Sequence, residues 1–324
     1  SSTGNSGEVC RKIPERKSST DSTPLLHPST TPPPPGKPVI ALVLASGGLK
    51  PLSALPLLEF LDSEGIKEDL LVGCSGGGIV SALRASGYSC ADIRGVAEAG
   101  FNKRMFQKNW RTLLGMYHLP GGCFDKTSGI FKPDQFLRRC TELFGGRRME
   151  ELQTKLILQV TDFDTGEGVG LSQGRLADAV YASMAIYPFF PPIQMNGRWL
   201  FDGCYSAPVP MMQAVNYPAD IIIVVEVLEN LSAPPSGFFN SMVHINKIFA
   251  QTIIRNQMTL SVMLHDYEII YVKVRFEKYL QIWDFKALPM IYAAGQAALE
   301  PHKQEILDVI REFRPTSSSS LSKS

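Results

Sequence analysis

Over residues 70–83, an apolar run is followed directly by a glycine-rich turn and then by a helical pattern. The apolar run at 70–72 is too short for a helix and predicts a buried strand. The turn reads Gly-Cys-Ser-Gly-Gly over residues 73–77, and the helix-compatible segment behind it ends at Gly87. This is the order of a nucleophile elbow, in which glycines let the chain bend sharply and a serine stands at the start of a helix. Ser75 is therefore the candidate nucleophile.

Two other interpretations compete for these glycines. So short a pattern occurs by chance, so a plain glycine-rich turn between a strand and a helix fits as well. A phosphate-binding loop fits less well, because no Lys follows in the Walker position and residues 73–78 do not read Gly-x-Gly-x-x-Gly.

Composition narrows the class of protein. The 324 residues are 44% hydrophobic, which suits one large or two small domains with a sizeable core. The formal charge of +1 gives no reason to expect nucleic acid as a partner. The six cysteines are scattered and form no Cys-x-x-Cys pair, so we expect reduced thiols rather than a zinc site or a disulfide scaffold.

The two ends of the chain differ from its middle. Residues 1–38 are rich in Ser, Thr and Pro and poor in apolar residues, so we expect them to be disordered. Residues 315–324 are expected to form a disordered, solvated tail, which leaves one domain over residues 39–314. No run approaches the ~18 apolar residues that a membrane span needs. An export signal is expected to be absent or already removed.

A strand, helix, strand unit opens the domain. Residues 39–44 form a continuous apolar run that predicts a strand covered on both faces. A glycine turn and a helical pattern over residues 53–63 separate it from the strand at 70–72. Because the crossover between parallel strands is right-handed, Gly47 and Gly48 should lie beside Ser75. Their backbone N–H groups, with that of Gly76, could bind an oxyanion. Alternatively, the first two glycines only begin a helix.

The later elements follow from the same patterns. Residues 88–150 are mostly helical and loop-like. The sequence then predicts a strand at 155–161, a turn at 166–168, a helix at 176–185, strands at 221–225 and 268–274, a long helix at 238–265 and a closing helix at 289–313.

A second chemical feature lies at residues 199–205. Asp202 follows an apolar run and precedes Gly203, so its carboxylate stands at the end of a strand and can point into a cleft. Asp-Gly is also an ordinary turn dipeptide, and only the pairing with Ser75 favours a catalytic role.

Several segments in the same order resemble the patatin-like phospholipases, over residues 39–310. The segments that carry the resemblance are residues 46–50 (Ser-Gly-Gly-Leu-Lys), 73–77, 161–166 (Thr-Asp-Phe-Asp-Thr-Gly), 182–185 with Pro188, Phe190 and Pro191, and 202–203 with Pro210.

The resemblance implies a three-layer α/β/α fold with a mainly parallel central sheet. It implies a Ser75–Asp202 dyad that hydrolyses lipid acyl esters through an acyl-enzyme. Gly47, Gly48 and Gly76 would form the oxyanion hole. The supporting motif positions would be Lys50, Gly73, Gly77 and Gly203. No metal or cofactor is implied, and the partner would be membrane or micellar lipid. We expect a cytoplasmic protein that associates transiently with membranes, with secretion as an effector and an activating protein partner left open.

Departures from the family pattern keep two alternatives open. Ser46 replaces the usual first Gly, Pro51 stands where Gly often follows, and Cys204 stands where the family often has other residues after the aspartate. These changes allow a catalytically weakened, lipid-binding protein. A Ser-His-Asp hydrolase also fits the chain order, with His244, His265 or His302 as the base, although all three lie in helix-like segments.

Two stretches carry surface hypotheses. Basic and aromatic residues alternate over 101–111, which favours a solvated helix face over contact with anionic lipid. Residues 238–264 are unusually rich in Met and Ile. A buried helix on the sheet is favoured there over a membrane-facing surface, and we hypothesise that one of its faces caps the active-site cleft.

Overall fold

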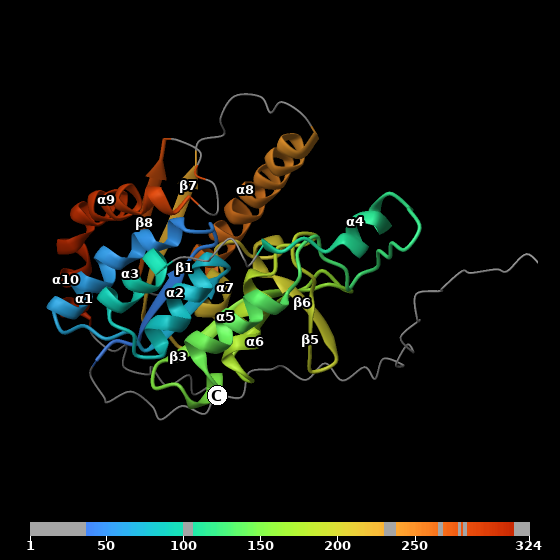
Figure 1. The fold of residues 1–324 in the computed structure, drawn as a ribbon. Coiled ribbons are helices and arrows are strands. Elements are labelled where there is room, and N and C mark those ends of the chain that lie inside the picture. Colours follow the sequence, from blue (N-terminus) through green and yellow to red (C-terminus); the bar gives the residue numbers. More distant parts are fainter. Residues whose placement is uncertain are drawn as a thin grey trace, which may run out of the picture.

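The computed structural model describes residues 37–99, 106–229, 238–264, 268–277, 280 and 284–313. Apart from residues 37 and 38, the two ends expected to be disordered lie outside this part of the chain, and the domain limits of 39–314 remain a prediction. The described residues form a mixed sheet of eight strands with helices on both faces (Figure 1). The strands are β1 (Ile40–Leu44), β2 (Leu70–Cys74), β3 (Lys155–Asp162), β4 (Gly168–Leu171), β5 (Ile193–Met195), β6 (Arg198–Asp202), β7 (Ile221–Glu229) and β8 (Glu268–Phe276).

The order across the sheet is β5-β6-β3-β2-β1-β7-β8, and β4 pairs with β3. Strands β3, β2, β1, β7 and β8 run parallel to one another, as the family resemblance implied. Strands β4 and β6 pair antiparallel with β3, and β5 pairs antiparallel with β6. The sheet is therefore parallel in its centre and antiparallel at the edge that carries Asp202.

Helices cover both faces of the sheet, which explains why β1 and β2 are buried along their whole length. The larger core joins the sheet to helices that include α1, α2, α5, α6 and α9, and the smaller core joins the other face to α7 and α8. The helices are α1 (Leu55–Ser63), α2 (Gly76–Ala85), α3 (Cys90–Ala99), α4 (Trp110–Met116), α5 (Asp134–Phe144), α6 (Leu176–Met184), α7 (Met211–Val215), α8 (Phe238–Leu264), α9 (Leu288–Leu299) and α10 (Lys303–Glu312). The three-layer α/β/α arrangement is thus confirmed.

Most predicted elements appear within one or two residues of their expected limits, and the exceptions have local causes. The helix expected at 53–63 begins as a 3₁₀ turn, η1 (Lys50–Ala54), with Pro51 in its first turn. The closing helix divides into α9 and α10 around the 3₁₀ turn η6 (Glu300–His302), because Pro301 cannot donate a backbone hydrogen bond. The short strand β5 was not predicted, since its three residues show no clear alternation.

The described side chains of the long helix α8 are half-buried or exposed, so the expectation of a core helix is not met at these positions. Ile254 packs against the smaller core, whereas Ile245, Ile248 and Phe249 are exposed. Among the described residues, no helix combines the length and the hydropathy that a bilayer-spanning segment needs.

Candidate active site

Ser75 lies at the sharp turn between β2 and α2. Its backbone has φ 52° and ψ −120°, a conformation that a non-glycine residue adopts only when its surroundings impose it. The side chain stands at the N-terminus of α2, where the helix dipole favours developing negative charge. Ser75 is 5% exposed, so its hydroxyl is held in a nearly water-free position.

The glycines around Ser75 are required by close backbone contacts rather than by unusual φ angles. A Cβ atom at Gly76 would lie 1.9 Å from the carbonyl oxygen of Gly48, and one at Gly77 would lie 2.4 Å from that of Leu44. A Cβ at Gly73 would meet the first turn of α2 at 2.6 Å. The elbow therefore packs directly on the loop after β1, as the right-handed crossover predicts.

Asp202 meets Ser75 from the antiparallel edge of the sheet. In the sheet register, Cys74 pairs with Gln159 of β3, and the next residue of β3, Val160, pairs with Asp202. The Ser75 hydroxyl donates a hydrogen bond of 2.8 Å to Oδ2 of Asp202. The backbone N–H of Cys204 donates to Oδ1 over 2.8 Å, which fixes the carboxylate plane. The two residues singled out from the sequence are thus in direct contact.

Burial governs the chemistry of the carboxylate. Asp202 has no exposed surface, and desolvation raises its pKa from 3.8 to about 6, against the lowering effect of the bonds from Cys204 and Ser75. A carboxylate with this pKa is a stronger base than an exposed one and is still mostly ionised at neutral pH. The pair can therefore transfer a proton from the serine to the aspartate.

The loop after β1 places two more N–H groups beside the elbow. Gly47 and Gly48 have φ values of 150° and 62°, which side-chain-bearing residues rarely adopt. Within the described residues, neither backbone N–H donates to a protein acceptor. Lys50 follows in η1 and is 9% exposed, so it is nearly buried beneath the loop. The N–H of Ser75 itself is engaged by Ser183, so Gly76, Gly47 and Gly48 remain the candidate oxyanion donors.

Sequence reasoning missed a polar network behind the site. Ser183 Oγ accepts from the N–H of Ser75 at 3.0 Å and donates to the carbonyl of Gln159 at 2.8 Å. The Thr161 hydroxyl donates to the carbonyl of Asp202 at 2.9 Å and lies 2.8 Å from the Ser206 hydroxyl. Two signals were present in the sequence: the polar residues within otherwise apolar segments at 155–161 and 176–185, and the family segments at 161–166 and 182–185, which contain Thr161 and Ser183.

The histidines do not join this site in the described part of the chain. His244 lies on α8, and His302 bonds to Glu305 through Nδ1 at 2.6 Å, while His265 falls outside the described residues. Ser75 instead donates to Asp202, so the geometry favours a dyad over a Ser-His-Asp arrangement. Among the described residues, no three His, Cys, Asp or Glu side chains are grouped so as to hold a metal ion.

Cysteines flank both members of the pair. Cys74, Cys90, Cys140 and Cys204 are free thiols, as expected, whereas Cys123 is disulfide-bonded, which the sequence did not predict. Burial, reinforced by the charge of Asp202, raises the pKa of the Cys74 and Cys204 thiols. Both thiols are thus protonated at neutral pH and serve as small packing groups rather than nucleophiles.

The family model for patatin-like phospholipase matches residues 42–215, more than half of the chain. The chain belongs to this family. The matched residues include the glycine loop, the elbow, the polar network and Asp202.

Curated relatives match a stretch slightly longer than the one that the family model matches. Lysophospholipase NTE1 of Debaryomyces hansenii is 28% identical over 188 residues, which are 58% of this chain and 12% of that protein. Lysophospholipase NTE1 of Candida glabrata is 30% identical over 188 residues, 58% of this chain and 10% of that protein. The chain thus spans a small part of the length of the relatives it matches.

Solved structures similar to this chain include those of VipD and ExoU. VipD from Legionella pneumophila has a TM-score of 0.48 at 13% identity and covers 85% of this chain and 67% of its own. ExoU from Pseudomonas aeruginosa, in complex with SpcU, has a TM-score of 0.43 at 15% identity and covers 85% and 53%.

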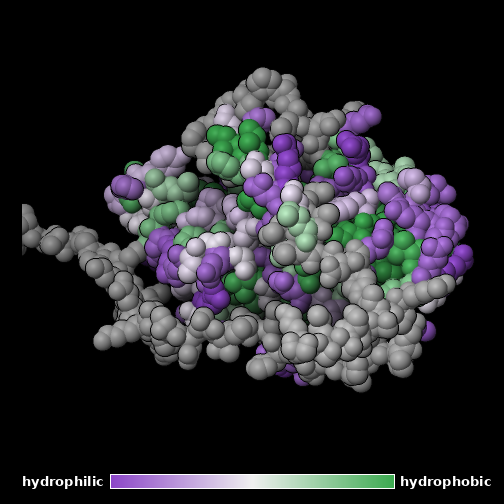
Figure 2. All heavy atoms as spheres, turned by 180° about the vertical axis from the view of Figure 1, so that it is seen from behind, coloured by the Kyte–Doolittle hydropathy of each residue, from purple (hydrophilic) through white to green (hydrophobic). Residues whose placement is uncertain are grey.

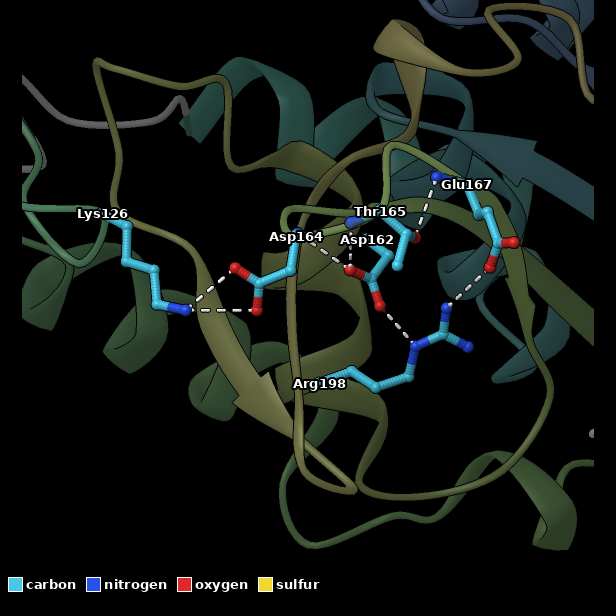
Figure 3. A network of polar contacts seen from close by, with 6 residues as sticks. All are labelled: Lys126, Asp162, Asp164, Thr165, Glu167 and Arg198. Atoms are coloured by element: carbon cyan, nitrogen blue, oxygen red, sulfur yellow. Dashed lines mark hydrogen bonds and ion pairs between the residues drawn. The ribbon is translucent and has the colours of Figure 1, made fainter. Parts of the chain in front are cut away.

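The family segment at 161–166 forms an ion-pair network beside the site (Figure 3). The Asp162 carboxylate accepts from Arg198 of β6 and from the N–H groups of Asp164 and Thr165 at 2.9 and 3.1 Å. Burial alone would raise the pKa of Asp162, but these bonds outweigh it and hold the pKa below 3.8. The network joins the β3–β4 turn to the strand that ends at Asp202.

Proposed function

We propose that this chain is a lipid acyl hydrolase in which Ser75 is the nucleophile and Asp202 the general base. The observation that carries the proposal is the 2.8 Å hydrogen bond from the Ser75 hydroxyl to a fully buried carboxylate whose pKa lies at about 6. An aspartate in water, with its pKa near 4, would be a weaker base.

The reaction divides into two steps. Ser75 Oγ attacks the ester carbonyl while its proton passes to Asp202 Oδ2, and the N–H groups of Gly47, Gly48 and Gly76 stabilise the oxyanion. The proton then passes from Asp202 to the leaving alcohol as the carbon–oxygen bond breaks. In the second step Asp202 takes a proton from water, which attacks the acyl-enzyme. The proton then passes from Asp202 to Ser75 Oγ as the acyl–oxygen bond breaks, which releases the fatty acid and restores the serine hydroxyl and the carboxylate.

The names of the relatives guide the choice of first substrate. Because they are called lysophospholipases, we propose a single-chain phospholipid as the substrate to test before diacyl lipids.

The test is fatty-acid release from lysophosphatidylcholine and from mixed phospholipid vesicles. We expect release by the unaltered chain and loss of about 10³-fold or more in Ser75→Ala and Asp202→Asn. Ser81→Ala is the matched control, because Ser81 is a buried serine on α2, the helix that directly follows Ser75. Full release by folded Ser75→Ala would refute the nucleophile. Loss in His244→Ala, His265→Ala or His302→Ala would instead favour the Ser-His-Asp mechanism. No release by the unaltered chain would favour a lipid-binding protein without activity.

A further inference from the structure

Exposed apolar side chains gather in two segments of the described chain. The described chain has ten exposed large hydrophobic side chains. Nine of them lie either in the loop at residues 106–131, which contains α4 and is called the α4 loop below, or on one face of α8. They are Trp110, Met116, Tyr117, Leu119 and Phe124 in the loop and Ile245, Ile248, Phe249 and Met263 on the helix. Such clustering is uncommon on soluble proteins and marks an interaction surface.

The α4 loop has a defined shape. Its two arms meet through backbone hydrogen bonds from Asn109 to Ile130 at 2.8 Å and from Lys132 to Gln107 at 2.9 Å. Near the tip, a Cβ at Gly122 would lie 2.2 Å from the nitrogen of Gly115, so the backbones are in close contact. With its interior filled by backbone, the loop must turn its large side chains outward. Trp110 and Tyr117 are accordingly 66% and 74% exposed.

The base of this loop is tied to the segment that carries the candidate base. Ile130 and Phe131 donate backbone hydrogen bonds to the carbonyls of Pro188 and Phe189 at 2.9 and 2.8 Å. The preceding residue, Tyr187, accepts at its carbonyl from the Tyr205 hydroxyl at 2.6 Å, three residues after Asp202. Lys126 on the returning arm also pairs with Asp164 at 2.9 Å (Figure 3).

The same turn after Asp202 is also bonded to α8. The side-chain amide of Gln257 donates to the carbonyl of Ser206 at 3.0 Å. From this attachment the helix extends away from the body on the same side as the α4 loop (Figure 1). The view from behind shows hydrophobic surface at the top, where α8 lies, and hydrophobic patches among hydrophilic residues at the left, where the α4 loop lies; a further hydrophobic area lies at the right (Figure 2). Residues 203–206 therefore link both apolar segments to the candidate site.

The charged residues of these two segments favour a lipid surface over other binding partners. The chain as a whole has 31 acidic residues, but residues 106–131 and 238–264 contain only one, Asp125. The exposed ionic groups there include Lys108, Arg111 and Arg255. Apolar side chains among mainly basic charged residues are typical of helices and loops that bind anionic membranes. Exposed Trp and Tyr suit the depth of the lipid headgroups.

We propose that the α4 loop and the exposed face of α8 form one docking surface for an anionic phospholipid bilayer. The proposal rests on the proposed function, because the docked bilayer would supply the ester to Ser75. It also assigns positions: the aromatic tip of the loop enters the interface, and the turn after Asp202 lies directly behind it.

Binding is measured by co-sedimentation with vesicles of phosphatidylcholine and phosphatidylserine. The variants are Trp110→Glu with Tyr117→Glu, and Ile245→Asp with Phe249→Asp. Met290→Asp is the matched control, because Met290 is 44% exposed on α9, away from this surface. We expect each double variant to bind roughly tenfold or more weakly while the control binds normally. Vesicles of phosphatidylcholine alone should bind less of the unaltered chain. Equal binding by all variants would overturn the proposal.

Tryptophan fluorescence tests insertion at one residue. Acyl-chain-brominated lipids should quench the emission of the unaltered chain, and Trp110→Phe should lose most of that quenching. Unchanged quenching in Trp110→Phe would overturn the assigned depth.

The oligomeric state of the double variants tests a protein partner. If they turned a dimer into a monomer and vesicles did not compete for the dimer contact, the face would be a protein interface and the lipid proposal would fail.

Activity on two kinds of ester separates this proposal from the proposed function. The double variants should lose vesicle hydrolysis about as much as binding, yet hydrolyse a short-chain soluble ester at the unaltered rate. Ser75→Ala should bind vesicles normally but hydrolyse neither the vesicle lipid nor the soluble ester. Vesicle binding without any hydrolysis by the unaltered chain would refute the proposed function alone. Vesicle hydrolysis that is insensitive to the double variants would refute the docking surface alone.

Discussion

Ser183 holds the backbone of Ser75 by a hydrogen bond of 3.0 Å from the Ser75 N–H to the Ser183 hydroxyl oxygen. The same hydroxyl donates to the carbonyl of Gln159 at 2.8 Å, so one fully buried side chain links the elbow to β3. Because the backbone of Ser75 lies in an unfavourable region of φ and ψ, this contact helps to maintain the turn.

Replacing Ser183 with Ala should therefore impair both folding and activity. The change leaves a buried N–H and a buried carbonyl without their partner, which lowers the free energy of unfolding by about 2–3 kcal/mol. Ester hydrolysis should fall by roughly tenfold or more in kcat, with little change in KM, since the nucleophile is misplaced rather than removed. Urea unfolding and steady-state kinetics measure the two effects.

Ser81→Ala is the matched control for this experiment. Ser81 is also a fully buried serine, but within the described residues its hydroxyl has no hydrogen-bond partner. Removing an unsatisfied hydroxyl should leave stability unchanged or raise it slightly. Equal losses in the two variants would mean that Ser183 acts through packing alone.

The pKa of Asp202 predicts how hydrolysis depends on pH. Burial raises this pKa to about 6, and the carboxylate must be ionised to accept the serine proton. The rate of hydrolysis of a soluble ester should therefore rise with pH through about 6 and level off above it. A kcat/KM profile with its acidic limb near pH 4 would contradict the assignment of Asp202 as the base.

The same shift predicts that Asp202→Asn stabilises the fold at neutral pH. A carboxyl whose pKa is raised in the folded state binds its proton more tightly there than in the unfolded chain. Stability from this group is then highest below the unfolded value near 4 and falls as pH rises through about 6. A neutral Asn should recover about 1–3 kcal/mol at pH 7. Chemical unfolding at pH 5 and pH 7 tests this, and the gain should shrink at the lower pH.

The sequence predicted the central part of the fold well because that part obeys simple periodic rules. The apolar runs at 40–44, 70–72 and 221–225 predicted β1, β2 and β7. Strand β7 pairs with β1 although residues 45–220 separate the two strands, whereas the parallel pairing of β1 with β2 follows from the short helical crossover between them. The contact between Gly48 and Gly76 was predictable for the same reason. The hairpin turn at 166–168 was predicted, and β3 and β4 pair antiparallel across it. Strand β5 was not predicted, because it has three residues and its pairing depends on a turn at Asn196 and Gly197.

The site could be predicted only where short sequence motifs indicate its chemistry. Ser75 and Asp202 lie next to glycines, and both glycines are needed for backbone contacts rather than for turns. A Cβ at Gly203 would lie 2.3 Å from the carbonyl oxygen of Gln159. The support from Ser183 and Thr161 comes from tertiary contacts that no local pattern records. Whether the pair is catalytic stays a prediction that the substitutions above will decide.

Arg198 should contribute more to stability than Lys126, although both pair with the 161–166 segment. Asp162 is 5% exposed, and without Arg198 its charge would stay buried with only backbone donors. Arg198→Ala should lower the free energy of unfolding by about 2–3 kcal/mol, whereas Lys126→Ala should cost under about 1 kcal/mol, because that pair is half exposed. Since the pKa of Asp162 is lowered in the fold, its stabilising effect is present above pH 4 and lost at lower pH. Thermal unfolding of both variants at pH 7 and pH 3 measures the difference, which should narrow in acid.

Gly295 should tolerate no side chain, because α9 packs there against the turn that supports the glycine loop. A Cβ at this position would lie 2.0 Å from the carbonyl oxygen of Ser53 in η1, a backbone atom that cannot move without displacing Lys50 and Pro51. Gly295→Ala should thus cost about 2–3 kcal/mol and lower hydrolysis as the loop shifts. Gly95→Ala is the matched control, since Gly95 lies in α3 with no atom within 4 Å of the added carbon. Gly95→Ala should instead raise the free energy of unfolding by about 0.5–1 kcal/mol, because Ala has a higher helix propensity than Gly. Equal unfolding midpoints for the two variants would show that α9 can move away from η1, and the glycine loop would then be less rigid than its contacts indicate.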